Sequence, residues 1–205
     1  MNRIIAKTGS MIVTVTVVLF AVCMLIPFSF GSYFVCMLLP MGYIMMIAGF
    51  CHESDGNHKV AANVGMMFAA IYATLILLVY FAQTTTVRLD SLSEEAMQLI
   101  DYSRGGLFFS YDLLGYAMLA LSTFFVGLTI DAKTKTDKWL KYLMMVHGIF
   151  FFGCFIMPMT GVFSSMSSGE TSVEGVIALE FWCAYFVPIG ILSMIHFRKG
   201  KSHAV

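Results

Sequence analysis

Six long apolar runs, separated by short polar segments, dominate the pattern along the chain. Each is close to the ~20 residues that an α-helix needs to cross the roughly 30 Å hydrocarbon core of a bilayer. The pattern therefore predicts six transmembrane helices, over residues 11–30, 34–50, 60–82, 107–130, 142–163 and 175–195. The first run is too long for the apolar part of a usual signal peptide, so we expect it to remain as the first span.

The composition agrees with a membrane protein. Of the 205 residues, 59% are hydrophobic and 12% are charged, against about 45–50% and about 25% in soluble domains. A soluble domain of this size could not hide so much apolar surface, whereas a bilayer solvates it. We predict an all-α, polytopic membrane protein: a six-transmembrane-helix bundle that forms a single integral domain over residues 1–205.

Basic residues are distributed unevenly between the two sides that six spans define. One side holds only Arg88 and Arg104, and the other holds the remaining ten of the 12. Because cytoplasmic loops carry the excess of Lys and Arg, the N- and C-termini are predicted to be cytoplasmic, in a cell (inner or plasma) membrane. The ten are Arg3, Lys7, Lys59, Lys133, Lys135, Lys138, Lys141, Arg198, Lys199 and Lys201.

The connections and prolines predict further features. Gly31 and Ser32 are expected to form a tight turn between the first two spans. Residues 83–106 form the long outer connection, where residues 91–94 read Ser-Leu-Ser-Glu, the form of a capping box, and open a short amphipathic helix. All four prolines fall inside predicted spans, where they are expected to kink helices. They are Pro27, Pro40, Pro158 and Pro188.

Three ionisable side chains fall inside predicted spans, where such groups are costly and point to function. Asp112 and Glu180 lie about six and five residues from the outer ends of their spans, which places both roughly 7–9 Å deep. His147 lies about five residues from the opposite end of its span. It is therefore expected roughly 13 Å from the carboxylates along the membrane normal, as a proton relay or as a helix-packing residue.

The matched depth of Asp112 and Glu180 predicts an outward-facing polar pocket lined by both carboxylates. The pocket is expected to take a cationic or zwitterionic group between them. An alternative is that each carboxylate pairs with a rim arginine or a tyrosine hydroxyl and only holds helices together. The other predicted ligand-binding residues are Tyr80, Gln83, Arg88, Arg104 and Tyr116.

Metal and cofactor chemistry has little support in the sequence. Met37, Met41 and Met45 share one helical face, and thioethers suit Cu(I), but methionine also fills irregular apolar gaps. The five cysteines are scattered without a CxxC pair. No zinc, phosphate-binding or hydrolase motif is present. We therefore predict no metal site, no cofactor and no catalytic residues.

Two segments carry a family resemblance. Residues 83–89 (Gln-Thr-Thr-Thr-Val-Arg-Leu) and 107–116 (Leu-Phe-Phe-Ser-Tyr-Asp-Leu-Leu-Gly-Tyr) resemble a pattern in uncharacterised bacterial multi-pass inner-membrane proteins. That resemblance implies a bacterial inner membrane and no particular activity. The size and span count are also similar to those of substrate-binding subunits of energy-coupling-factor vitamin importers. The predicted first span, however, lacks their small-residue AxxxA feature.

These features lead to a function prediction with two alternatives. We predict a membrane protein that binds or transports a small cationic or zwitterionic solute through the outward pocket. The alternatives are a membrane-embedded lipid-modifying enzyme and an accessory or sensory subunit. The expected partners are the lipid bilayer, a small-molecule ligand, and a membrane protein or second copy of the chain. With a net charge of +0 and no basic block, no nucleic-acid partner is predicted.

Overall fold

The computed structural model describes residues 1–161 and 173–198, and the regular elements in this part of the chain are all helical. Six segments are long and apolar enough to cross a membrane, which confirms the predicted all-α, six-span pattern. They are α1 (Asn2–Leu25), α2 (Ser29–Glu53), α3 (Lys59–Thr84), α6 (Leu107–Thr129), a broken segment that begins with α7 (Lys135–His147), and α9 (Val173–Arg198).

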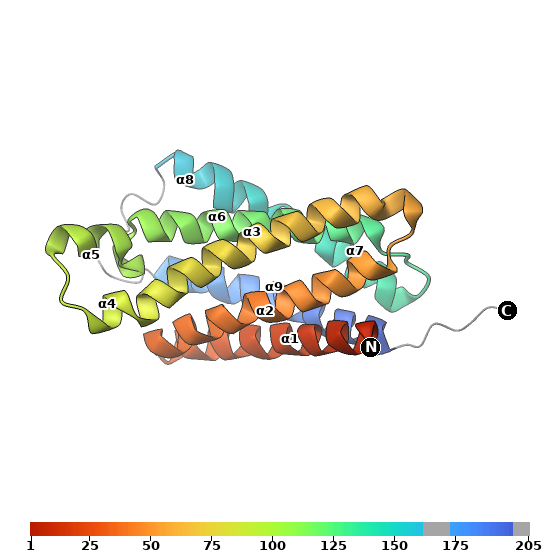
Figure 1. Cartoon of the computed structure of the whole chain (residues 1–205), viewed down its shortest axis with the longest axis horizontal. Helices are drawn as coiled ribbons and strands as arrows, with labels where there is room; N and C mark the ends of the chain where they lie inside the picture. The colour runs from red at the N-terminus through yellow and green to blue at the C-terminus, as the bar shows by residue number, and fades with distance from the viewer. Residues whose placement is uncertain (162–172, 199–205) are drawn as a thin grey trace.

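The six segments run alternately in opposite directions and close into a ring in chain order (Figure 1). Each packs against the spans before and after it in sequence, and α9 closes the ring by packing against α1. We call the end that carries Met1, the α2–α3 connection and the α6–α7 connection the basic end. The opposite end, which carries residues 85–106, is the loop end.

Aromatic and polar side chains fill the interior of the ring, while large apolar side chains point outward. Tyr43, Tyr72 and His147 are fully buried at 0% exposure, whereas Phe81 and Ile149 are 62% and 65% exposed. In a soluble protein such exposed apolar groups would be costly, but lipid solvates them. The molecule therefore has a more polar inside than outside, which is the arrangement that lets a membrane protein hold a polar site.

The turn between α1 and α2 lies earlier than predicted. Helix α1 ends at Leu25, and the chain reverses over residues 26–28 around Pro27. Proline has no amide hydrogen to continue the helix and disfavours helical geometry in the preceding residue, so the helix stops there. The expected turn at Gly31 and Ser32 is wrong, since both residues lie inside α2. Pro27 is consequently in a loop and cannot kink a helix.

The small residues of α1 lie nearer the N-terminus than the predicted first span. Because α1 begins at Asn2, its first half packs closely on α2. A Cβ on Gly9 would lie 2.6 Å from the carbonyl oxygen of Gly42, and a Cβ on Gly49 would lie 2.2 Å from the Ala6 side chain. Small residues of this kind let two membrane helices approach. A span placed at residues 11–30 missed this contact.

The fifth segment begins seven residues before the predicted start at residue 142. Thr134 caps α7: its hydroxyl accepts the Asp137 amide at 3.2 Å, and the Asp137 carboxylate accepts the Thr134 amide at 3.3 Å. Three lysines in the first turns lower the apparent hydropathy, which explains the error. After His147 the segment breaks and continues as η3 (Phe152–Ile156, a π-helix) and α8 (Met157–Met159). Predicted residues 162–163 lie outside the described chain.

The long connection contains the expected short helix. It runs through α4 (Thr86–Leu89), α5 (Glu94–Ile100) and the 3₁₀ turn η2 (Tyr102–Arg104). The cap of α5 is Ser93 rather than Ser91, because the Ser93 hydroxyl accepts the Ala96 amide at 3.3 Å. Two glutamates then occupy the first turn, where the helix dipole favours carboxylates. This connection brings η2 back over the ends of α3 and α6.

Candidate functional site

A buried carboxylate lies near the loop end of the ring. Asp112 on α6 is only 3% exposed, and its Oδ1 atom has no hydrogen-bond partner among the described residues. The hydroxyl groups of Tyr80 on α3 and Tyr102 on η2 are directed at it. We call this group the Asp112 cluster. Its members are Tyr33, Cys36, Tyr80, Tyr102, Asp112 and Tyr116.

Three tyrosine rings of the cluster pack together on the side of Asp112 that faces the loop end. The ring centroids of Tyr33 and Tyr80 are 5.6 Å apart, those of Tyr80 and Tyr102 5.9 Å, and those of Tyr33 and Tyr102 6.1 Å. Such contacts are typical of stable aromatic packing. Burial and the nearby Asp112 charge raise the pKa of Tyr102 well above its usual value, so its hydroxyl group remains a hydrogen-bond donor.

Gln83 attaches this cover to α3. Its side-chain Nε2 donates to the Ile100 carbonyl at 2.7 Å, and its Oε1 accepts the Tyr102 amide at 3.0 Å. Gln83 is 3% exposed, so these bonds replace contacts with water. We predicted Gln83 as a ligand-binding residue. In the structure its amide group holds the backbone on both sides of Asp101 and thereby positions Tyr102.

The two arginines of the loop end have partners other than Asp112 and Glu180. The Arg88 guanidinium lies 4.9 Å from the centroid of the Phe30 ring, and its Nε donates to the Thr84 carbonyl at 3.1 Å. Arg104 pairs with Glu94 and, at 3.5 Å, with Asp101. In the described residues neither arginine therefore pairs with Asp112 or Glu180. The helix-packing alternative also allowed tyrosine hydroxyls, and those of Tyr80 and Tyr102 are directed at Asp112.

Glu180 lies on α9 beside the Asp112 cluster rather than in direct contact with Asp112. Its Oε1 atom is buried and has no hydrogen-bond partner among the described residues. No hydrogen bond or electrostatic contact joins it to Asp112 in this part of the chain. Both carboxylates lie near thiols: Cys36 is within electrostatic range of Asp112 and of Cys183, and Cys183 is within range of Glu180.

A column of tyrosines leads from the Asp112 cluster into the centre of the ring. Tyr116 lies one helical turn below Asp112, and its ring contacts Tyr72 at 5.9 Å, edge to face. Tyr72 in turn contacts Tyr43 at 5.4 Å. The hydroxyl groups of Tyr72 and Tyr43 are buried and have no hydrogen-bond partner in the described chain. Unpartnered polar atoms therefore continue from Asp112 toward the basic end.

His147 is fully buried and both of its ring nitrogens are bonded. Trp182 donates its indole N–H to Nε2 at 3.1 Å, so Nδ1 carries the hydrogen and faces the Thr123 hydroxyl at 2.7 Å. The Thr123 hydroxyl donates onward to the Ala120 carbonyl at 2.9 Å. The imidazole is neutral in this arrangement and ties α7 to α6 and α9. The geometry agrees with the helix-packing alternative better than with a proton relay.

His147 lies farther along its segment than expected, because α7 starts earlier. The residue lies 12 positions after Lys135, which is about 18 Å along the helix axis. Its partner Thr123 lies 11 residues after Asp112 on α6, which is about 16 Å along that helix. His147 is therefore well separated from Asp112 along the ring, and Trp182, which contacts Tyr116 at 5.2 Å, lies between His147 and the Asp112 cluster.

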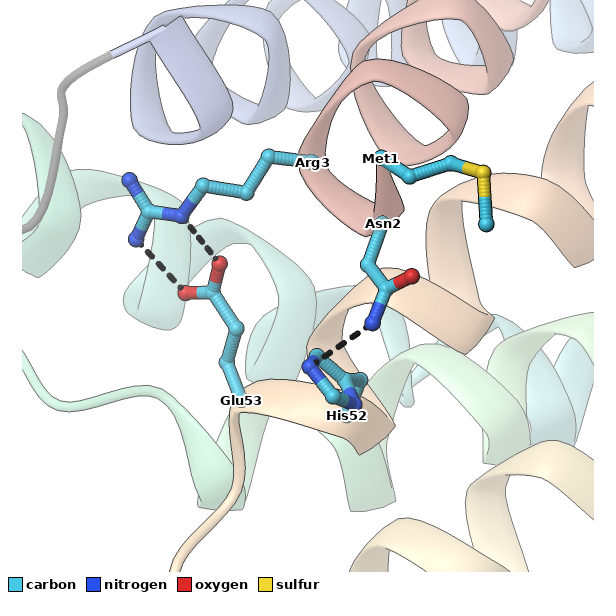
Figure 2. A pocket seen from close by; sticks show the side chains of 5 residues that line it. All are labelled: Met1, Asn2, Arg3, His52 and Glu53. Carbon is cyan, nitrogen blue, oxygen red and sulfur yellow. Dashed lines mark hydrogen bonds and ion pairs between the residues drawn. The ribbon is translucent and has the colours of Figure 1, made fainter.

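The basic end holds a second group of charged residues, which we call the basic-end network. Figure 2 shows Arg3 reaching from α1 to Glu53 at the end of α2, with Nε and Oε1 2.7 Å apart. His196 on α9 lies between two carboxylates: its Nε2 is 3.2 Å from Glu53 and its Nδ1 is 2.9 Å from Asp137 on α7. Carboxylates only accept, so both ring nitrogens donate. The sequence reasoning did not identify this network.

The sequence reasoning also missed most of the tyrosines around Asp112. Of the predicted site residues, the structure brings together Asp112, Tyr80 and Tyr116, and it adds Tyr33, Tyr72 and Tyr102. A signal was present, since Tyr72 and Tyr80 are eight residues apart in one apolar run and so share a helical face. Tyr102 could not be found this way because it lies in the connection.

Comparisons with protein-family models, with curated proteins and with solved structures gave no match.

Proposed function

We propose that the chain is a multi-pass cell-membrane protein whose basic end faces the cytoplasm. The fold groups Arg3, Lys59 and Lys135 with the other basic connections at one end of the ring, and the loop end carries Arg88 and Arg104. This distribution is the one that the positive-inside rule describes. The loop end then faces outward, and Asp112 lies in the outer half of the membrane.

We infer that the protein binds and carries a small cationic or zwitterionic solute, and that Asp112 recognises its positive group. The observation that carries this inference is the Asp112 carboxylate, 3% exposed and with an unpartnered oxygen. An ionised carboxylate inside a membrane protein is costly unless a cation pairs with it. Tyrosine ring faces also attract cations. An organic ammonium group satisfies both the carboxylate and the surrounding rings.

Access to Asp112 requires movement of its cover. Tyr102 is held over the site by the Gln83 bonds and by ring contacts with Tyr33 and Tyr80. Breaking these few contacts would lift η2 and expose the carboxylate to the outside. The basic-end network closes the other end by joining α1, α2, α7 and α9. Opening the two ends in turn would move a solute past the buried tyrosine hydroxyls.

Two observations support this role over the alternatives. As helix-packing groups of an accessory subunit, Asp112 and Glu180 would be fully paired, but each retains an unpartnered buried oxygen in the described chain, even though the Tyr80 and Tyr102 hydroxyls are directed at Asp112. In a lipid-modifying enzyme His147 would be a poor acid or base, because both of its ring nitrogens are bonded to Thr123 and Trp182.

The test is the thermal stability of the detergent-purified protein with inorganic cations, primary and quaternary amines, amino acids and zwitterionic vitamins. A ligand at 100 times its Kd stabilises the native state by about 2.7 kcal/mol. We expect at least one amine or zwitterion to raise the unfolding midpoint of wild type and of Asp90→Asn, which changes an exposed carboxylate at the same end. Asp112→Asn should abolish the effect.

The variant Glu180→Gln tests whether the Glu180 carboxylate also contributes to solute binding. If Glu180 contacts a second part of the solute through the Cys36–Cys183 region, its replacement should weaken binding about tenfold, whereas Asp112→Asn should remove it. If no compound distinguishes wild type from Asp112→Asn, the proposed recognition site is wrong. A stabilising compound that acts equally on both would place the binding site elsewhere.

A further inference from the structure

One exposed face of α7 combines positive charge with large aromatic rings. Lys135, Lys138, Trp139 and Tyr142 line a shallow hollow of about 380 Å³ on this face. Their spacing of three, four and seven residues places all four side chains on the same side of the helix. Trp139 and Tyr142 are 60% and 59% exposed, and their rings contact each other edge to face at 6.2 Å.

The positive charge of this face is not neutralised within the described part of the chain. The ammonium groups of Lys135 and Lys138 have no hydrogen-bond or ion-pair partner there. The nearest carboxylates are engaged elsewhere, since Asp131 pairs with Lys133 and Asp137 faces Thr134 and His196. The hollow therefore has two ammonium groups available for an anion and no carboxylate to repel one.

Beyond the break that follows His147, the segment continues toward the loop end with exposed apolar side chains. Ile149 and Phe152, seven and ten residues beyond Tyr142, are 65% and 62% exposed. Tryptophan and tyrosine side chains favour the level of the lipid head groups, with apolar residues on one side and water on the other. The order along the segment is thus two lysines, two amphipathic rings and an apolar stripe.

We propose that this face is a binding site for an anionic phospholipid in the leaflet at the basic end. Lys135 and Lys138 contact the phosphate and head group, Trp139 and Tyr142 lie beside the glycerol and ester region, and an acyl chain follows Ile149 and Phe152. The charge of the lysines complements an anionic lipid and not a zwitterionic one. This proposal requires the membrane embedding of α7, but it does not depend on any solute at Asp112.

The chain offers a direct probe, because it contains two tryptophans and Trp182 is only 6% exposed. The protein is reconstituted in phosphatidylcholine bilayers with increasing fractions of brominated phosphatidylglycerol or brominated phosphatidylcholine, and tryptophan quenching is recorded. The variant Trp139→Phe gives the residual signal of Trp182, so the difference reports Trp139. We expect phosphatidylglycerol to quench Trp139 at a several-fold lower fraction than phosphatidylcholine.

The lysines are tested by the double variant Lys135→Gln/Lys138→Gln. Since each lysine near a membrane surface contributes about fivefold to the preference for anionic lipid, this variant should lose most of it. The double variant Lys7→Gln/Lys133→Gln has the same net charge and changes lysines of the same end, so it should retain the preference. Equal quenching by both lipids in wild type, or an equal loss in the two double variants, would overturn the proposal.

Discussion

The two ends of the ring differ in whether their buried carboxylates have cationic partners. At the basic end, Glu53 is shared by Arg3 and His196, and His196 also reaches Asp137, so four helices meet through paired charges. At the loop end, Asp112 has no basic residue within reach and one of its oxygens has no hydrogen-bond partner in the described chain. The buried carboxylates of the basic end therefore have cationic partners, whereas at the loop end Arg104 pairs with Glu94 and Asp101 and not with Asp112.

Under the proposed function, this difference corresponds to a structural role at the basic end and a binding role at the loop end. A buried charge that already has its partners stabilises one arrangement of helices, and removing one partner is strongly destabilising. A buried carboxylate without a cationic partner lowers the stability of the empty protein and gains most from a cationic ligand. Removing a carboxylate should therefore change the free energy of unfolding in opposite directions at the two ends.

The largest effect is expected at the basic end. Glu53→Gln removes the charge that Arg3 and His196 share and leaves two cationic groups close together, so the protein should lose about 2–3 kcal/mol of stability. A thermal or denaturant titration of the purified protein measures this loss. Asp55→Asn is the matched control, because its pair with His58 is exposed and should contribute little. A loss of stability smaller than that of Asp55→Asn would contradict the role of Glu53 in holding the helices together.

A smaller change of opposite sign is expected at the loop end. In the absence of any solute, Asp112→Asn removes a buried charge that has no cationic partner in the described chain, keeps the shape of the side chain and leaves an amide oxygen to accept from the tyrosine hydroxyls. The stability of the empty protein should therefore stay the same or rise, by about 1–2 kcal/mol at most. The same unfolding titration compares it directly with Glu53→Gln. A marked loss of stability would show that Asp112 holds helices together, and the contrast between the two ends would fail.

The smallest effects concern two tyrosine hydroxyl groups. Tyr185 donates to the Leu143 carbonyl at 2.8 Å, whereas the Tyr72 hydroxyl has no partner in the described chain. Tyr185→Phe should cost about 1 kcal/mol, while Tyr72→Phe should be neutral or slightly stabilising. Both variants remove one hydroxyl oxygen from a tyrosine, so each serves as the control for the other in the unfolding assay. Equal losses would mean that the Tyr72 hydroxyl is bonded in solution.

The positions of Asp112, His147 and Glu180 show which features of the candidate site could be predicted from the sequence. The depth argument singled out Asp112, and the structure places it among tyrosines near the loop end. The same argument started the fifth span too late, because three lysines concealed the first turns of α7. It paired Asp112 with Glu180 by depth alone, and depth does not tell which side of a helix faces which neighbour. In the described chain no hydrogen bond joins the two carboxylates.

The sequence by itself determined the number of spans, the one-sided distribution of basic residues and the approximate position of Asp112 and Glu180 along their spans. These are properties of hydropathy and charge along the chain, and they depend on local sequence alone. Only the tertiary structure decided that the spans close into a ring, that Tyr102 returns from a connection to cover Asp112, and that Arg3, Glu53, His196 and Asp137 meet. The contacts among Arg3, Glu53, His196 and Asp137 join residues 50 to 143 positions apart, and side-chain packing between helices selects them.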